Sequence, residues 1–213
     1  HLAHRRQRQM CIRDSLSYLN KELAGKSDEN LELISVICSV ADSTVEIAMD
    51  TRVTGLKQIR GSANEINVQG EEVQMLDQIA NKSLIDSLSK NSSCAGYASE
   101  EIDEPLIFNQ SSRFMVVADP LDGSSNISVN MPIGTIFGII RNTDYGVSSF
   151  NKSGRYYISA GYSLYGPSDI FVICVNNKVS EFTLDPKKKE YQLSRDDIKV
   201  PRTGSVYSLS LIH

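Results

Sequence analysis

The chain has 213 residues, of which 40% are apolar, and its formal net charge is −4 at pH 7. This length and apolar content suffice for a hydrophobic core in one domain or two small ones. The acidic balance argues against nucleic acid as a partner. The longest apolar runs are far shorter than the roughly 20 residues of a membrane-spanning helix, so no membrane segment is expected.

Both ends of the chain read as foreign to the fold. Residues 1–15, HLAHRRQRQMCIRDS, contain four arginines but no hydrophobic period, and resemble translated sequencing adapter, as does the closing SLSLIH. We therefore interpret 1–15 and 210–213 as non-native tails and 16–209 as one incomplete domain, truncated at its C-terminus. A genuine disordered tail is the alternative at the N-terminus.

The cysteines give no sign of a metal or redox motif, because they are irregularly spaced and include no Cys-x-x-Cys pair. We interpret them as buried thiols: Cys11, Cys38, Cys94 and Cys174. Nothing resembles a secretory signal, and a chain of this size needs no disulfide framework. A cytoplasmic location is therefore expected.

Two amphipathic helices are predicted in the first half. Apolar residues recur every three or four positions from residue 29 to about 50, with Asp28 placed as the N-cap. After the polar loop RGSANEINVQGEE, a second periodic segment extends to residue 88. Its first turn carries two acids, where the helix dipole favours negative charge: Glu71 and Glu72.

After residue 90 the pattern changes to short β-type runs separated by Gly, Pro, Asn and Asp clusters. VNNKV and DPKKKE read as hairpin turns, and the lysines of the second as a solvated turn. Helices followed by strands predict one α+β layered unit. The predicted strands are 94–99, 113–118, 134–141, 156–166, 169–177, 178–184 and 190–194.

The stretch ADPLDGSSN, residues 118–126, concentrates polar chemistry at the end of a predicted strand. Asp119 and Asp122 lie three residues apart across a Pro-Leu turn, so their side chains can point the same way, and the carbonyl of Leu121 can join them. Mg²⁺ and Mn²⁺ prefer such oxygen ligands. The amides that follow can form a cradle for an anion: Gly123, Ser124 and Ser125.

A second acidic patch, YASEEIDEP, ends another predicted strand. Glu100 and Glu101 are therefore expected beside the first corner. Because side chains alternate along a strand, one glutamate can face metal ions while its neighbour faces a water molecule. Asp77, on the second helix, can orient that glutamate.

These motifs together closely resemble class I fructose-1,6-bisphosphatases. The matching stretches are NVQGEEVQMLDQIAN, GYASEE, DPLDGSSNI, GTIFGI, AGYSLYG and VYSL, and the resemblance runs from about residue 16 to 209. It implies the layered α/β sandwich of the inositol-monophosphatase-like sugar phosphatases. Asp-Pro-x-Asp-Gly alone would cover that wider superfamily, whereas Asn126 favours fructose over sedoheptulose bisphosphate.

The resemblance implies Mg²⁺-dependent hydrolysis of the 1-phosphate of fructose 1,6-bisphosphate, a step of gluconeogenesis, by a homo-oligomer, expected to be a tetramer. Mn²⁺ is an alternative cofactor. The implied metal ligands are Glu100, Asp119, Asp122 and the Leu121 carbonyl, with Glu71 at a weaker site. The implied water-activating pair is Asp77 and Glu101, and the implied 1-phosphate cradle is Gly123, Ser124 and Ser125.

Two departures from the family pattern stand out. Ser128 replaces the usual aspartate after SSNI, and about a third of the enzyme, with sugar-binding residues and a late metal-binding glutamate, is absent. We therefore expect no bisphosphatase activity from this chain alone, and pairing through its unfinished sheet. AMP regulation through Arg113 and Arg141 stays open. The alternatives are a sedoheptulose-bisphosphatase, an inositol or nucleotide phosphatase, and a non-catalytic metal- or phosphate-binding piece.

Overall fold

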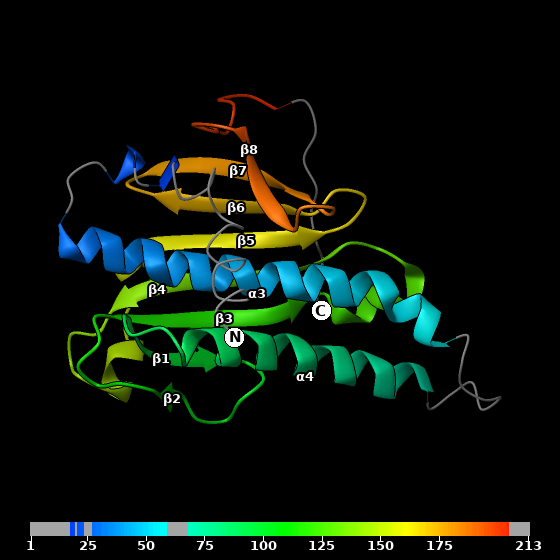
Figure 1. Ribbon diagram of the computed structural model, residues 1–213, viewed down its shortest axis with the longest axis horizontal. Helices are drawn as coiled ribbons and strands as arrows, with labels where there is room; N and C mark the ends of the chain where they lie inside the picture. Colours follow the sequence, from blue (N-terminus) through cyan, green and yellow to red (C-terminus); the bar gives the residue numbers. More distant parts are fainter. Residues whose placement is uncertain (1–17, 20, 24–26, 59–67, 205–213) are drawn as a thin grey trace.

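The computed structural model describes residues 18–19, 21–23, 27–58 and 68–204. In these residues two long helices, α3 (Asp28–Gln58) and α4 (Val68–Leu88), precede an eight-stranded sheet. Both helices lie in front of the strands in Figure 1. The predicted order, helices first and then one sheet, is confirmed.

The sheet has the order β2-β1-β3-β4-β5-β6-β7-β8. Its neighbouring strands are antiparallel except β1 and β3, which run parallel, so the carboxyl ends of those two strands meet at one place. The strands are β1 (Cys94–Ser99), β2 (Leu106–Ile107), β3 (Phe114–Asp122), β4 (Ile133–Arg141), β5 (Ser159–Tyr165), β6 (Ile170–Val175), β7 (Lys178–Asp185) and β8 (Glu190–Arg195), with 3-10 turns η1 (Ser124–Val129), η2 (Val147–Phe150) and η3 (Gly154–Tyr156).

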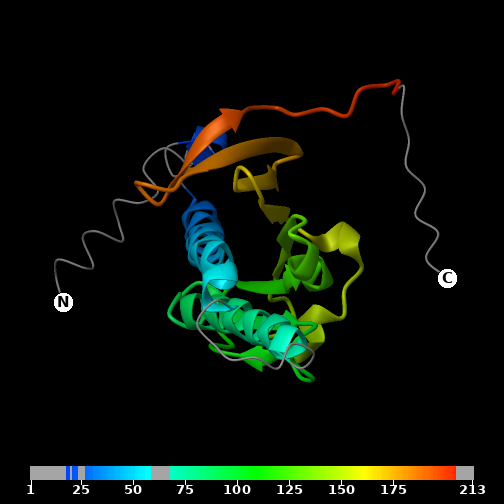
Figure 2. The ribbon, with the colours of Figure 1, turned by 90° about the vertical axis from the view of Figure 1, so that its right-hand side faces the viewer.

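The main hydrophobic core lies between the helices and one face of the sheet. Apolar side chains of α3 and α4 pack there against alternate residues of the strands, such as Phe114, Val116 and Phe137. The sheet twists strongly, with α4 near one end and the β7–β8 hairpin at the other (Figure 2). On the opposite face, a small cluster forms around Met115, while Tyr162 of β5 is exposed. In the described part of the chain, the sheet is therefore covered mainly on one side.

The first helix differs from its predicted bounds at both ends. Ser27, not Asp28, is the N-cap, because the Ser27 hydroxyl accepts a hydrogen bond from the Asn30 N–H at 3.2 Å. The helix also continues beyond residue 50. Arg52 explains part of this extension, since it forms a 2.5 Å ion pair with the buried Asp169, which precedes β6.

Three other boundaries were wrong. Helix α4 begins at Val68, so Gly70 is helical rather than part of a loop. The strand predicted over 113–118 continues to Asp122, so DPLD belongs to β3 and is not a turn. The segment predicted from 156 becomes a strand only at Ser159, because Tyr156 lies in η3. The two-residue strand β2 and the 3-10 turns were not predicted.

Both hairpin predictions are confirmed. Asn176 and Asn177, between β6 and β7, have φ of 52° and 61°, the left-handed conformations that a two-residue type I′ turn requires. The turn between β7 and β8 also contains a left-handed residue, Lys189.

Of the described cysteines, Cys38 and Cys94 are buried thiols, as predicted, and Cys174 is only partly buried; all three are free. Cys11 lies outside the described residues, and none of the described helices is long and apolar enough to cross a membrane.

Candidate functional site

The two aspartates of DPLD lie on the same face of the sheet. In a regular strand, residues three apart would face opposite sides. Asp119, however, pairs with Ile136 of β4, and Asp122 pairs with Gly134, two residues away. Because directly paired residues share a face, so do the two carboxylates. The predicted common orientation is therefore present, although a strand produces it and not a turn.

A β-bulge accounts for this arrangement. Pro120 and Leu121 together oppose the single residue Thr135, and the register shifts between the two aspartates. The Leu121 side chain is buried in the main core. The Thr135 hydroxyl donates a 2.8 Å hydrogen bond to the carbonyl of Pro120. Sequence reasoning did not assign Thr135 to the site; it noted GTIFGI only as a mark of the family.

Glu100 lies beside Asp119 because β1 and β3 are parallel and in register. Ser99, the last residue of β1, pairs with Ala118, so the next residue of each chain segment comes to the same corner. Burial raises the pKa of Asp119 to about 6, helped by the charges of Glu100 and Asp122 and by a hydrogen bond with Glu100, while the N–H of Leu121 opposes the shift. The structure thus brings together three of the predicted metal ligands.

Asp77 faces this corner from α4. Burial and then the charge of Glu101 raise the pKa of Asp77 to about 6, and a hydrogen bond with Ser124 opposes the shift. One turn further along α4, Asn81 accepts a 3.0 Å hydrogen bond from the buried hydroxyl of Tyr97 on β1. This bond ties α4 to β1, so the helix that carries Asp77 is fixed against the strand that ends at the two glutamates.

Gly123 begins the turn after β3 and has φ of 78°, a left-handed conformation that glycine adopts without strain. Its carbonyl accepts a 2.8 Å hydrogen bond from the Asn126 N–H, and this bond closes the first turn of η1. The first residue of η1 is Ser124, and the exposed Ser125 follows it. Glu71 is the fourth residue of α4, because the helix begins earlier than predicted, and its side chain and that of Ser128 lie outside what the structure describes.

The donor set suits a divalent cation in its chemistry. Its members are carboxylate oxygens and one nearby backbone carbonyl, the ligands preferred by hard cations. Burial and then the charges of Glu100 and Asp122 raise the pKa of Asp119, and a cation would relieve the repulsion among these carboxylates. Among the described side chains, however, no three acidic, histidine or cysteine groups converge closely enough to hold a metal ion by themselves. The described side chains therefore form only part of a metal site.

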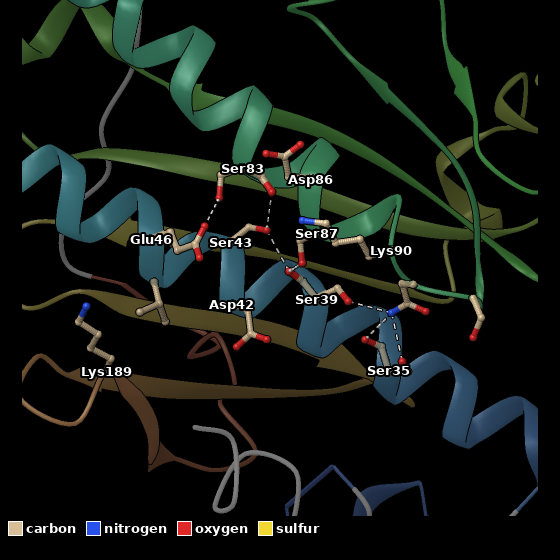
Figure 3. Close-up of a pocket in the computed structure, with 13 residues that line it drawn as sticks. Ser35, Ser39, Asp42, Ser43, Glu46, Ser83, Asp86, Ser87, Lys90 and Lys189 are labelled. Carbon is tan, nitrogen blue, oxygen red and sulfur yellow. Dashed lines mark hydrogen bonds between the residues drawn. The ribbon is translucent and has the colours of Figure 1, made fainter. Parts of the chain in front are cut away.

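A separate groove of about 790 Å³ lies between α3 and α4. Figure 3 shows its polar lining of serines from both helices, with acids and lysines at the rim. The Ser43 hydroxyl donates to the carbonyls of Ser39 and Ser83, and the Ser87 hydroxyl also donates to Ser39. None of the predicted site residues lines this groove.

The two arginines considered for nucleotide binding pair with the start of α3. Arg113 forms a 2.7 Å ion pair with Glu32, and Arg141 a 2.8 Å ion pair with Glu29. All four side chains remain partly exposed. In this structure both arginines therefore attach the first turns of α3 to the amino end of β3 and the carboxyl end of β4.

This layered sheet, with acids at the joined carboxyl ends of β1 and β3, has the α/β sandwich fold of the inositol-phosphatase-like sugar phosphatases. Residues 17–196 match the family model described as "Fructose-1-6-bisphosphatase, N-terminal domain". The chain belongs to the fructose-1,6-bisphosphatase family, which implies a divalent metal cofactor.

Comparison with individual relatives supports the same family assignment. The chain is 42% identical over 180 residues to a class 1 fructose-1,6-bisphosphatase of Sulfurihydrogenibium sp., covering 84% of this chain and 56% of that protein. It is 42% identical to the class 1 enzyme of Persephonella marina, covering 77% and 52%. The Leishmania major fructose-1,6-bisphosphatase in apo form aligns with a TM-score of 0.76 at 27% identity, over 92% of this chain and 60% of that one. The chain thus spans about half the length of the curated relatives it matches.

Proposed function

We propose that this protein hydrolyses the 1-phosphate of fructose 1,6-bisphosphate in a Mg²⁺-dependent reaction, giving fructose 6-phosphate and phosphate. Mn²⁺ is the expected substitute. The observation that supports this most strongly is the gathering of acids from β1, β3 and α4 around the bulge of β3, in a chain that belongs to this family. The proposal includes a cytoplasmic homo-oligomer, expected to be a tetramer, with a role in gluconeogenesis.

The proposed metal ligands are the carboxylates of Glu100, Asp119 and Asp122 and the carbonyl of Leu121, with Glu71 serving a weaker site. A bound divalent cation would supply charge neutralisation for the phosphoryl group and its leaving oxygen. The protein's part is to hold the carboxylates of Asp119 and Asp122 on one face of the sheet, which the bulge supports.

Asp77 and Glu101 form the proposed pair that activates the attacking water. In this assignment Glu101 accepts the proton, and Asp77 orients Glu101 and the water. The proximity of the two groups supports the pairing, because the charge of Glu101 contributes to the raised pKa of Asp77.

The 1-phosphate is proposed to bind at the backbone amides of Gly123, Ser124 and Ser125. The left-handed conformation of Gly123 brings the chain round from β3 into η1, directly after Asp122. The phosphate would therefore lie next to the carboxylates, and the phosphorus atom would be within reach of the activated water. Such positioning is worth several orders of magnitude in rate.

The test is phosphate release from fructose 1,6-bisphosphate by a full-length protein that carries this sequence, measured against Mg²⁺ concentration. Asp122→Ala is expected to abolish turnover while leaving the melting temperature near that of the unmodified protein, because Asp122 is exposed. Asp103→Ala, at an exposed acid of the second acidic patch, YASEEIDEP, is the matched control and should stay active. Retained activity of Asp122→Ala at saturating Mg²⁺ would exclude the ligand assignment. Faster hydrolysis of sedoheptulose or inositol phosphates would exclude fructose 1,6-bisphosphate as the main substrate.

A further inference from the structure

We propose that Thr135 and Tyr165 are positioning residues for the carboxylate site, because their hydroxyls hold the bulge that places Asp119 and Asp122 on one face of the sheet. The inference rests on the proposed function, in which these carboxylates bind a metal ion. It assigns a role to two side chains that lie outside the proposed set of metal ligands and phosphate-binding amides.

Thr135 contacts the bulge directly. It is fully buried on β4, opposite Pro120 and Leu121, and its hydroxyl donates to the Pro120 carbonyl at 2.8 Å. A bulge interrupts the regular ladder of backbone hydrogen bonds, and proline has no N–H to contribute. The Thr135 side chain therefore supplies a hydrogen bond at the point where the ladder between β3 and β4 is broken.

Tyr165 supports Thr135 from the next strand. The two hydroxyl oxygens are 2.6 Å apart, and since the one proton of Thr135 is donated to Pro120, Tyr165 must be the donor to Thr135. Complete burial raises the pKa of Tyr165 well above its usual value, so this proton stays in place at neutral pH. The result is a directed chain from Tyr165 through Thr135 to the Pro120 carbonyl, in which each bond polarises the next.

The backbone keeps these two side chains in reach. Gly134, next to Thr135, lies so close to β5 that a Cβ there would be 2.6 Å from the carbonyl oxygen of Ser163. The close approach of β4 and β5 brings the long Tyr165 side chain to the threonine. Thr135 belongs to GTIFGI and Tyr165 to AGYSLYG, so the proposal explains why two stretches without acids accompany DPLDG in this sequence.

The experiment compares Thr135→Val, which removes the hydroxyl but keeps the shape, with Thr135→Ser, which keeps the hydroxyl. Ser159→Ala is the control, because Ser159 is equally buried in the same sheet and donates to Cys174, far from the bulge. All are made in the full-length protein, with circular dichroism to confirm folding. Two quantities are measured: Mn²⁺ affinity by electron paramagnetic resonance, and, without metal, amide hydrogen exchange of residues 119–123, of which Pro120 has no amide hydrogen.

We expect Thr135→Val to bind Mn²⁺ about 10-fold more weakly, the lower end of the loss seen when groups that orient metal ligands are removed. Its exchange at 119–123 should be faster, whereas Thr135→Ser and Ser159→Ala should match the unmodified protein. Tyr165→Phe leaves Thr135 in place, so its Mn²⁺ affinity and amide exchange should lie between those of Thr135→Val and those of the unmodified protein. If Thr135→Val does not fold, Tyr165→Phe alone tests the proposal.

Unchanged exchange at 119–123 in both Thr135→Val and Tyr165→Phe would overturn the proposal. An equal loss of Mn²⁺ affinity in Ser159→Ala would also overturn it, because that result would show a general effect on the sheet. Failure of the proposed function gives a different result: the unmodified protein would bind no Mn²⁺ or release no phosphate, while the exchange measurement would still report on the bulge.

Discussion

Glu100 and Glu101 are neighbours in the chain, but they have different partners. Glu100 interacts chiefly with Asp119, whereas Glu101 is the larger of the two charges acting on Asp77. The two glutamates are the central residues of the turn that follows β1, in which the Ile102 N–H donates to the Ser99 carbonyl, so they do not continue the alternation of the strand. The two glutamates should therefore respond differently to the same substitution.

We predict that Glu101→Gln in the full-length protein lowers kcat by about 10²–10⁴-fold, the usual range for losing a general base, with little change in metal affinity. Glu100→Gln should chiefly weaken metal binding, so that its activity recovers in part at high Mg²⁺. Steady-state kinetics across a Mg²⁺ series measures both effects. Equal losses of metal affinity in the two variants would show that the roles are assigned wrongly.

The left-handed conformation of Gly123 gives a second prediction. Gly123→Ala forces a Cβ into a φ of 78° and to 3.2 Å from the side-chain amide of Asn126, so the free energy of unfolding should fall by about 1–2 kcal/mol. Gly154→Ala is the control, because a Cβ there meets only the Tyr157 ring at 3.6 Å, an ordinary contact. Urea denaturation measures both. A loss in Gly154→Ala as large as in Gly123→Ala would contradict the conformational explanation.

The residue types of the site were readable from the sequence, but part of their environment was not. Oxygen ligands in DPLDG and paired glutamates at a strand end predict a cation corner because that chemistry depends on residue identity. Thr135 could not be found this way, since its role comes from lying opposite the bulge, and strand register is not written in any one segment. The side chain of Glu71 lies outside the described residues, so its predicted role stays a prediction.

At the scale of elements, serines of both helices form the polar side of the contact between α3 and α4. Ser43 is almost completely buried there, and its hydroxyl bonds to backbone carbonyls of both helices. Small side chains allow two helices to approach closely, and the carbonyl acceptors keep the buried hydroxyls satisfied. This seam fixes α4, and therefore Asp77, relative to the rest of the core.

We predict that Ser43→Leu lowers the free energy of unfolding by about 1–3 kcal/mol, because the larger side chain overpacks the seam. Ser43→Ala, which removes only the hydrogen bonds, should cost about 1 kcal/mol. Gln78→Leu, at an exposed position of α4, should have little effect. Thermal and urea denaturation test the series, and a Ser43→Leu variant as stable as Gln78→Leu would disprove close packing at this seam.

Most elements could be predicted from periodicity, because a helix or strand with one buried face repeats its apolar residues. The errors occurred where tertiary contacts override local signals. Proline and glycine in DPLDG indicate a turn, yet pairing with β4 keeps Asp119 to Asp122 in a strand. The extension of α3 is helped by the partnership of Arg52 with Asp169, 117 residues away in the chain. Strand β2, with two residues, is too short to show a period.

Across the whole molecule, a cluster of charged and polar groups joins the start of the described chain to its end. The hydroxyl of Tyr18 donates to Asp196, which follows β8, and Lys178 of β7 pairs with the same carboxylate. The hydrogen bond from Tyr18 and then the one from Lys178 lower the pKa of Asp196 to about 2. The N-terminal segment is thereby attached to the edge of the sheet far from the carboxylate corner.

This cluster predicts a pH dependence of stability. Because the folded-state pKa of Asp196 is below the unfolded value of about 3.9, its stabilising effect is present above that value and is lost as the pH falls toward 2. Asp196→Asn should therefore lower the melting temperature at pH 7, and the difference from the unmodified protein should shrink between about pH 4 and pH 2. Asp197→Asn, beside it but paired only with the nearby Lys199 among the described ion pairs, should show a smaller difference. A difference independent of pH would rule out the ionised carboxylate as its cause.

The bulge of β3 also decides which backbone atoms are available for chemistry. A regular strand uses the carbonyl oxygens that face β4 in bonds to that neighbour, and a shorter Asp-x-Asp sequence would also place two carboxylates on one face. The residue that a bulge adds is left outside the ladder. With the spacing Asp-x-x-Asp, which puts Pro120 and Leu121 between Asp119 and Asp122, the proposed Leu121 carbonyl would add a second kind of oxygen ligand at no cost in side chains. Under the proposed ligand assignment, a single extra residue near the end of a strand would thus turn structural backbone into part of a binding site.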